Sequence, residues 1–398
     1  MSYPLEGLRV LDMSRVLAGP LAGRLLSDLG ADVVKVEPPD GDITRLWGAE
    51  FGGIAGYFNQ QNVGKRNICI DMSVEGGTEL VKALVREADI LVENFRPSVM
   101  PRFGLGYETL KEINPRLIML SISGFGANGP ESLRAAYAPI IHAEIGLVAR
   151  QSGLINAGAS GQKYTDIAVP VADTNASLHG LVGLLSALYM REQTGAGQHI
   201  DLAMIDASLI NDDQVHYALE DSAATRAMPP EIWDTVTGPV IIAGDFRHIW
   251  KKLVEDCDMK DPTPEGAPLK DKIRLRRAAA QKFIRELPDR KSLIDALSGM
   301  NLAWGDVRDI ATIRDQPTVK HRGSIVEVDN KEGGTRPVVQ SPYRFSGAES
   351  GIRGPAPAMG EHNVVVLRDW LGKGEDDVQK YLSSGVLIAP VKEQKDHV

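Results

Sequence analysis

The feature that most constrains the fold is a regular alternation of short apolar runs and amphipathic segments between residues 8 and 123. Runs of strand length stand at 8–13, 31–37, 66–72, 89–95 and 116–123, with helical patterns at 19–30, 75–88 and 106–115. Strands joined by helices form right-handed crossovers in a parallel sheet that is covered on both faces. The sequence therefore predicts an α/β fold with a Rossmann-like parallel sheet in the large domain.

This rhythm changes after about residue 206. The stretch 267–300 is charged and helical, the stretch 261–271 is rich in proline and charge, and strand character returns at 323–330. We predict three segments: 1–205 as the N-terminal part of the large α/β domain, 206–325 as a small domain with its linkers, and 326–398 as a C-terminal segment that returns to the large domain.

Charge and cysteine content exclude several classes of protein. The net charge is −9, whereas chains that bind nucleic acid are usually basic. Cys69 and Cys257 are the only cysteines, so neither a disulfide framework nor a structural metal site is expected, and Cys69 fits a buried strand position. The sequence shows neither a signal peptide nor an apolar run that spans a membrane, which favours a cytoplasmic protein without membrane contact.

The stretch "SISGFGANGP" places Gly124, Gly126 and Gly129 in the spacing of a dinucleotide-binding loop, directly after a predicted strand. A dinucleotide site also needs a helix that starts at the third glycine and a later strand that ends in an acid. The sequence after Gly129 offers neither, and Pro139 interrupts any long helix. We therefore interpret these glycines as a tight loop near a ligand, not as a nicotinamide or flavin site.

Asp173 stands just ahead of an apolar helix that is expected to end at Gly195. The apolar positions of this helix are Leu178, Leu181, Leu184, Leu185 and Leu188. A carboxylate at a helix start fits an N-cap, and the helix dipole there would lower its pKa and keep it ionised. An ionised carboxylate among small apolar residues also fits a nucleophile. The spacing alone leaves both interpretations open.

A series of motifs along nearly the whole chain resembles the family III CoA-transferases, the CaiB/BaiF type. The motifs are "LEGLRVLDMSRVLAGPLAGRLLSDLGADVVKVEPPDGD", "NVGKRNICIDM", "DILVENFRPSVMPRFGLGYETLKEINPRLIMLSISGFGANGP", "VADTNASLHGLVGLLSALYMREQTGAGQHIDLAMIDAS", "GSIVEV", "SPYRFSG" and "APAMGEH". The resemblance implies a CoA-transferase that moves CoA from an acyl-CoA to a small carboxylic acid. It also implies a smaller α+β domain and an interlocked homodimer.

The resemblance assigns roles to individual residues. Asp173 matches the family's covalent nucleophile, which forms an aspartyl anhydride and then an aspartyl-CoA thioester. CoA is a substrate in this family, so no tightly bound cofactor and no metal are expected. The positions that match the family's CoA contacts are Arg15, Ala18, Lys65, Asn94, Phe95, Arg96, Arg102, Phe103 and Arg134.

The sequence departs from the family pattern near the expected acyl pocket. Leu17 stands where formyl-CoA transferase has a glutamine, Ala138 replaces the acid of a usual "YD" pair, and His142 replaces the glutamine of a usual "QA" pair. His142 and Glu144 either line the acyl pocket or are structural. The alternative function is that of an α-methylacyl-CoA racemase, although Tyr137 stands where that enzyme has its histidine.

Overall fold

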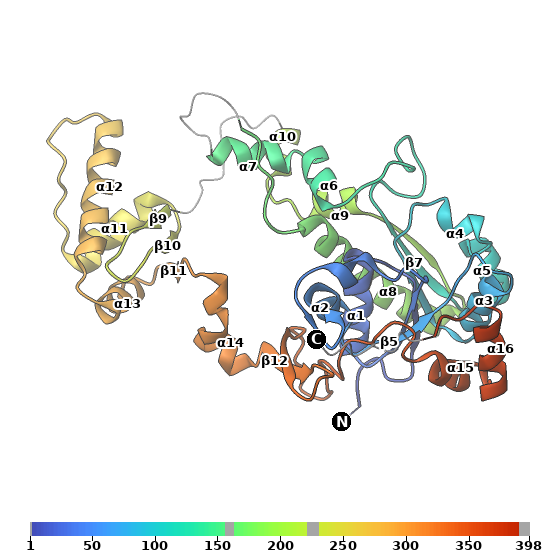
Figure 1. The fold of residues 1–398 in the computed structure, drawn as a ribbon. Coiled ribbons are helices and arrows are strands. Elements are labelled where there is room, and N and C mark those ends of the chain that lie inside the picture. Colours follow the sequence, from blue (N-terminus) through green and yellow to red (C-terminus); the bar gives the residue numbers. More distant parts are fainter. Residues whose placement is uncertain (1, 156–162, 221–230, 390–398) are drawn as a thin grey trace. The chain divides into compact units, whose positions relative to one another are not determined.

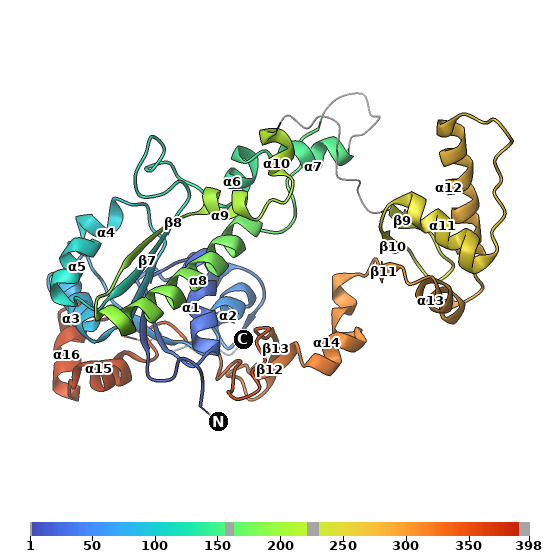
Figure 2. The same cartoon turned by 180° about the vertical axis from the view of Figure 1, so that it is seen from behind.

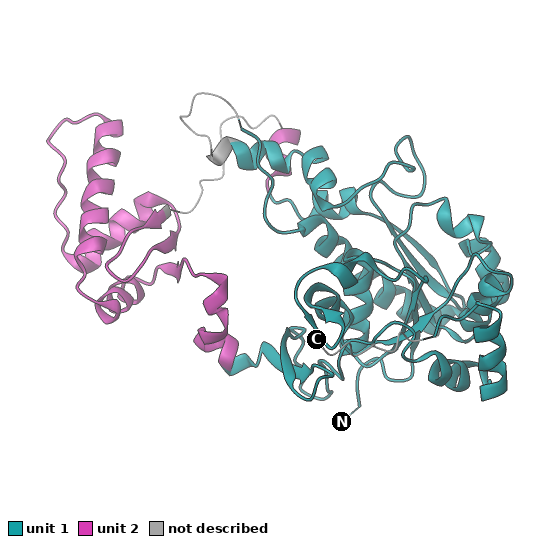
Figure 3. Cartoon of the chain, viewed as in Figure 1, with its two compact units in different colours: residues 1–213, 321–398 teal, residues 214–320 magenta. Residues whose placement is uncertain are grey.

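The chain forms two compact units in a computed structural model that describes residues 2–155, 163–220 and 231–389. Unit 1 comprises residues 1–213 and 321–398, and unit 2 comprises residues 214–320 (Figure 3). The sequence predicts these boundaries after residues 205 and 325. The C-terminal segment belongs to the same unit as the N-terminal half of the chain.

Unit 1 is built on a sheet of six strands, all parallel to one another. The predicted parallel α/β fold is thereby confirmed. The order of the strands across the sheet is β5 (Arg66–Cys69), β2 (Asp32–Glu37), β1 (Arg9–Asp12), β6 (Ile90–Glu93), β7 (Ile118–Ser123) and β8 (His199–Ala203).

Strand β8 lies at the edge of this sheet and was not predicted from the sequence. Its pairing with β7 places Leu120 opposite Ile200. His199 and Asp201 on the other side of the strand are exposed, because an edge strand is covered less completely than a central one. The alternation of Ile200 and Leu202 with these polar residues was the available signal.

Helices cover both faces of the sheet, and side chains from each strand alternate between two apolar cores. In β1, Val10 belongs to one core and the next residue, Leu11, to the other. The Leu11 core packs under α3 (Gly77–Glu87), α4 (Val99–Arg102), α5 (Tyr107–Ile113), α15 (Asn363–Leu371) and α16 (Glu375–Ser383). The Val10 core packs under α1 (Ala18–Asp28), α6 (Ala138–Glu144), α8 (Val171–Thr194) and α9 (Met204–Ile210).

Two long-range packing contacts complete this unit. The C-terminal helix α15 packs against α3 and β5, far from it in sequence (Figure 1). Helix α8 crosses the opposite face beside β7 and β8 (Figure 2). Gly180 allows the close approach of α8, because a Cβ there would lie 2.8 Å from Leu120 Cδ2.

The remaining elements of unit 1 lie in short connections and two antiparallel hairpins. A small core around Phe58 and Val338 joins the segment after β2 to the C-terminal hairpin. These elements are η1 (Ile43–Leu46), β3 (Glu50–Phe51), β4 (Ile54–Ala55), α2 (Gly56–Asn62), α7 (Leu147–Ile155), β12 (Ile325–Asp329) and β13 (Thr335–Val339).

Unit 2 has a three-stranded antiparallel sheet in addition to the helices that the charged 267–300 stretch predicts. Trp233 and Trp250 lie in its core, and Asp245 and Asp289 cap two of its helices by accepting backbone N–H bonds. Its elements are α10 (Val215–Leu219), β9 (Glu231–Trp233), β10 (Val240–Ala243), α11 (Phe246–Cys257), α12 (Leu269–Glu286), α13 (Arg290–Gly299), β11 (Ala303–Asp306) and η2 (Ile310–Asp315). Helix α14 (Pro317–Arg322) crosses into unit 1.

Candidate active site

Unit 1 contains a cavity of about 550 Å³ at the carboxyl ends of its central strands. Strand order reverses between β1 and β6, and ligands of open α/β sheets bind at such a switch point. Most of the lining residues come from the loops after β1, β6 and β7 and from the first turn of α8, and one each comes from η1 and α9. They are Arg15, Val16, Ala18, Ile43, Asn94, Phe95, Arg96, Pro97, Val99, Ile122, Ser123, Gly124, Ser132, Arg134, Ala136, Tyr137, Asp173 and Met204.

Asp173 is the third residue of α8 and not its N-cap. The helix begins at Val171, and the capping position is occupied by Pro170, which makes no side-chain hydrogen bond to the helix. The N-cap interpretation of Asp173 is therefore wrong. Its carboxylate instead faces the backbone N–H groups of Ala18 and Ala138, the first residues of α1 and α6.

The pKa of Asp173 is raised to about 6, whereas the sequence predicts a lowered value. Burial is the largest cause, because it withdraws the carboxylate from water. The N–H groups of Ala138 and Ala18 lower the pKa by a smaller amount. At pH 7 the group is mostly ionised, and its higher basicity favours attack on a carbonyl carbon.

The loop after β1 presents Arg15 and Val16 to the cavity in a strained conformation. Val16 has φ of 68°, a left-handed backbone that β-branched residues rarely adopt. Its N–H donates to Asp42 Oδ2 at 3.2 Å. The side chain of Asn94 makes two hydrogen bonds to the backbone of Arg15. It accepts from Arg15 N–H and donates to Arg15 O, each at 2.8 Å.

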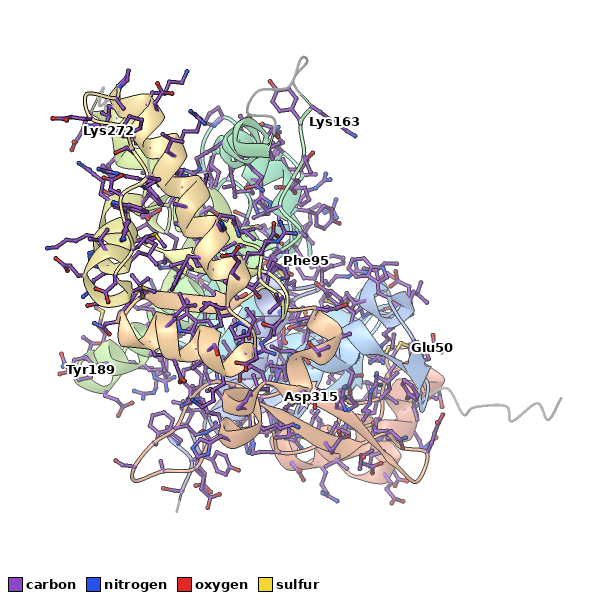
Figure 4. The ribbon with its side chains drawn as sticks, turned by 90° about the vertical axis from the view of Figure 1, so that its left-hand side faces the viewer. Glu50, Phe95, Lys163, Tyr189, Lys272 and Asp315 are labelled. Carbon is purple, nitrogen blue, oxygen red and sulfur yellow. The ribbon has the colours of Figure 1, made fainter. Side chains whose placement is uncertain are left out.

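The loop after β6 is anchored by a buried acid. Phe95 N–H donates to Glu93 Oε2 at 2.8 Å, and burial raises the pKa of Glu93 to about 7. Phe95 and the exposed Arg96 follow directly, so Glu93 and Asn94 fix the segment that lines the cavity. Figure 4 labels Phe95 among the surrounding side chains.

The structure brings together most of the residues that the sequence predicts for the site, but not all of them. Arg15, Ala18, Asn94, Phe95, Arg96, Arg134 and Asp173 line the cavity. Arg102 is exposed at the end of α4, and Phe103 packs against the Leu11 core. Neither belongs to the lining.

Lys65 is the clearest difference from the expected arrangement. Its ammonium is buried and donates to Asp12 Oδ2, Pro20 O and Asn62 Oδ1, each at 2.8 Å. Burial lowers the pKa of Lys65 to about 8. The lysine therefore binds the residues on either side of the β1 loop, Asp12 and Pro20, and does not line the cavity.

The two residues left open by the sequence, His142 and Glu144, have different positions. His142 is 1% exposed and is not part of the cavity lining. Glu144 is exposed and accepts a hydrogen bond from Arg134, which also bonds Glu131. The positive charge of Arg134 is thus already compensated by two carboxylates.

Two further residues near the candidate nucleophile were not predicted from the sequence. Tyr57 is not part of the cavity lining, and its pKa is raised first by burial and then by the charges of Asp173 and Asp42. Ser123 lines the cavity with a buried Oγ that has no hydrogen-bond partner among the described residues. Neither has a sequence signal beyond its place after an apolar run.

The glycine loop after β7 has no dinucleotide geometry. No helix begins at Gly129, because the chain continues through turns until α6 begins at Ala138. Gly124 is required for packing, since a Cβ there would lie 2.3 Å from Ala136 Cβ.

Among the described residues, no group of three or more His, Cys, Asp or Glu side chains is placed to hold a metal ion. Over the same residues, no helix combines the length and apolarity needed to cross a membrane.

Fold and cavity together are those of an α/β protein with a cavity at the switch point of a parallel sheet, where such proteins bind their ligands, beside a partly buried carboxylate. A family model described as CoA-transferase family III matches residues 5–363, and the chain belongs to this family. The resemblance predicted from the motifs is confirmed, and the protein is an enzyme of the CoA-transferase class.

Several characterised proteins are similar to this chain over almost their whole length. Succinate–glutarate CoA-transferase of Agrobacterium fabrum is 32% identical, with 92% of this chain and 95% of the relative covered. Succinyl-CoA:mesaconate CoA-transferase of Haloarcula hispanica is 32% identical, with 94% and 98% covered. The crystal structure of a CaiB/BaiF family protein from Brucella suis superposes with a TM-score of 0.77 at 32% identity, covering 93% of this chain and 100% of that one.

Proposed function

We propose that the enzyme transfers CoA from an acyl-CoA thioester to a free carboxylic acid through covalent intermediates on Asp173. The observation that carries this proposal is the position of the Asp173 carboxylate, at the wall of the cavity and facing two backbone N–H groups. These N–H groups are suited to hold the oxygen of an aspartyl carbonyl once the charge of the carboxylate is lost, and then the oxyanion that forms on it.

The proposed steps account for every atom, and no water molecule takes part in them. An Asp173 oxygen attacks the thioester carbonyl, the C–S bond breaks, and a mixed anhydride and CoA thiolate form. The thiolate attacks the aspartyl carbonyl, which releases the donor acid and leaves aspartyl-CoA. The acceptor carboxylate then displaces the thiolate from Asp173, and the thiolate attacks the acceptor carbonyl of the new anhydride to give the product and regenerate Asp173.

CoA binding is assigned to the charged and aromatic groups around the same cavity. Arg15 and Arg96 supply positive charge for the phosphates, and Ala18, Asn94 and Phe95 supply close backbone, amide and aromatic surface. Arg102 and Phe103 stay in the proposal as contacts outside this cavity. Lys65 contributes indirectly, through the loop that carries Arg15.

The relatives suggest which substrates to test first. Their names contain succinate, glutarate, succinyl-CoA and mesaconate, so succinyl-CoA is the first donor and short dicarboxylic acids are the first acceptors. A panel with acetyl-CoA and monocarboxylic acids alongside tests whether a second carboxylate is needed. The cytoplasmic location stays a prediction.

No observation favours the racemase alternative. Exchange of an α-proton needs a second acid/base group in the cavity, and His142 was the candidate. Both of its ring nitrogens contact protein groups, and the ring is buried away from the cavity lining. Incorporation of deuterium at the α-position of an acyl-CoA would favour the racemase instead.

The proposed mechanism is tested with an acceptor acid labelled with heavy oxygen in its carboxylate. The steps above move one labelled oxygen from the acceptor to Asp173 and then to the next donor acid released. We expect label in the peptide that carries residue 173 after a single turnover, measured by mass spectrometry. Turnover without label in that peptide would contradict covalent catalysis by Asp173.

We also propose that the chain forms an interlocked homodimer. Helix α8 packs one face on the sheet but exposes apolar side chains on the other, and an apolar stripe of this size usually marks an interface. A second copy of the chain is the occupant we assign to it. The stripe consists of Leu178, Val182, Leu185 and Tyr189, with exposed fractions of 49%, 62%, 38% and 71%; Tyr189 is labelled in Figure 4.

Light scattering after size exclusion tests this assembly. We expect dimers even at nanomolar protein, because interlocked chains have no stable folded monomer. Val182→Glu places a charge in the stripe and is expected to produce monomers or aggregates, whereas Thr109→Glu adds the same charge at an exposed position of another helix, α5. A wild-type monomer at nanomolar concentration would contradict the proposal.

A further inference from the structure

His142 is a residue of α6 that contacts the first turn of α8, next to the candidate nucleophile in space but outside the cavity lining. It stands one turn after Ala138 in α6 and is 1% exposed. The backbone N–H of Ala172, the residue before Asp173, donates to His142 Nε2 at 3.3 Å. On its other side, His142 Nδ1 lies 3.0 Å from Asp166 Oδ1.

These partners determine the protonation of the ring. Because Ala172 N–H is a donor, Nε2 must be an acceptor, and the ring proton must then lie on Nδ1. Asp166 accepts a hydrogen bond from this Nδ1–H, and its Oδ1 also accepts one from Ile167 N–H at 2.8 Å. The contacts therefore select a neutral imidazole with its proton on Nδ1.

His142 takes the place of the missing N-cap of α8. The first N–H groups of a helix have no partner within the helix, and a side chain at the N-cap usually accepts one of them. Pro170 cannot do this, and the imidazole of His142 accepts the Ala172 N–H from another helix. Helix α6 thus contacts the start of α8 twice, through His142 and through Ala138, whose N–H faces Asp173.

We propose that His142 is a positioning residue for the transfer reaction. It fixes the first turn of α8, and with it the direction of the Asp173 carboxylate, through the acceptor nitrogen Nε2. This inference rests on the proposed role of Asp173 as nucleophile. Since His142 is buried outside the cavity lining, we expect its loss to affect the formation of the covalent intermediate and not the affinity for CoA.

Two substitutions test the hydrogen bonds of the two ring nitrogens of His142 separately. The amide oxygen of His142→Gln can reach the position of Nε2 and accept the Ala172 N–H. The shorter side chain of His142→Asn can reach Asp166 but not Ala172. A matched control is His179→Gln in α8, where Nε2 lies 3.0 Å from the side-chain amide nitrogen of Asn211.

The readout is the rate at which heavy oxygen enters the Asp173 peptide, together with the dissociation constant for CoA. We expect His142→Gln and His179→Gln to label close to the wild-type rate. His142→Asn is expected to label about 10- to 100-fold more slowly, because a displacement near 1 Å of a reacting group can cost about two orders of magnitude. The CoA dissociation constants should agree among all four proteins.

Each outcome decides between the two proposals. An unlabelled wild-type peptide would refute the role of Asp173 as nucleophile. Nitrogen NMR would then show which ring nitrogen of His142 carries the proton. With a labelled wild type, equal rates in His142→Asn and wild type, or equally slow rates in His142→Gln and His142→Asn, would refute the positioning role. If His142→Asn does not fold, the ring nitrogens of the wild type decide: a proton on Nε2 would overturn the inference, and a proton on Nδ1 supports it.

Discussion

Replacement of Asp173 by Asn is expected to abolish CoA transfer while CoA binding is retained. The amide keeps the shape of the carboxylate and can still accept from Ala18 N–H and Ala138 N–H, but it cannot attack a thioester. Removal of a covalent nucleophile costs at least about 10⁴-fold in rate in well-studied hydrolases, and we expect a loss of that order. The measurements are product thioester by mass spectrometry and CoA affinity by calorimetry.

The same substitution should stabilise the protein at neutral pH. The folded protein raises the pKa of Asp173 from 3.8 to about 6, so ionisation opposes folding at pH values above both numbers. Asn removes this cost, up to about 3 kcal/mol at pH 7. The gain should shrink as the pH falls from about 6 towards 4 and vanish below 3.8, where Asp173 is protonated in both the folded and the unfolded chain.

A matched control for this experiment is Asp206→Asn. Asp206 is also an acid in the first turn of a helix, α9, but it is exposed. We expect this variant to keep both the activity and the stability of the wild type. Residual transfer by both Asp173→Asn and Asp173→Ala would show that another group carries the acyl fragment.

Replacement of Lys65 by Met is expected to cause the largest loss of stability. The ammonium lies in a buried network with the carboxylate of Asp12, and its removal takes away the ion-pair partner of that carboxylate. Loss of one partner from a buried ion pair costs about 3–5 kcal/mol. Urea denaturation should show this decrease in the free energy of unfolding.

The matched control is Lys82→Met, because Lys82 is also 2.8 Å from a carboxylate, that of Glu79 on α3. Glu79 is largely exposed there, and such surface pairs contribute at most about 1 kcal/mol. The double variant Lys65→Met with Asp12→Asn should be more stable than Lys65→Met alone. An equal effect of Lys65→Met and Lys82→Met would contradict the structural role of the buried pair.

Much of the fold could be predicted because strand and helix periodicity is local. The runs containing Val10, Val33 and Ile90 show buried strands directly, since both neighbours in a central parallel strand are covered. The edge strand β8 escaped because half of its side chains face water. The C-terminal helices α15 and α16 were not predicted from the sequence either. Helix α15 packs against β5 and α3, and α16 packs against α15.

The candidate site was predictable only as a set of motifs. Asp173, Asn94 and Phe95, which the family pattern assigns to the site, line one cavity. The pattern did not reveal that Lys65 turns away from that cavity. The direction of a lysine depends on the nearest carboxylate in space, and Asp12 lies at the end of β1, far from Lys65 in sequence. Gly23 shows the same dependence, because a Cβ there would lie 2.6 Å from Asp12 Oδ2.

The sequence by itself determined the alternation that forms the sheet, the family of the chain and the identity of the acid at the start of α8. The tertiary structure decided what that acid experiences. Its pKa, its hydrogen-bond donors and the imidazole that caps its helix come from Ala18, Ala138 and His142, residues distant in sequence. Desolvation and hydrogen bonding depend on neighbours in space, and those neighbours are set only when the separate helices pack together.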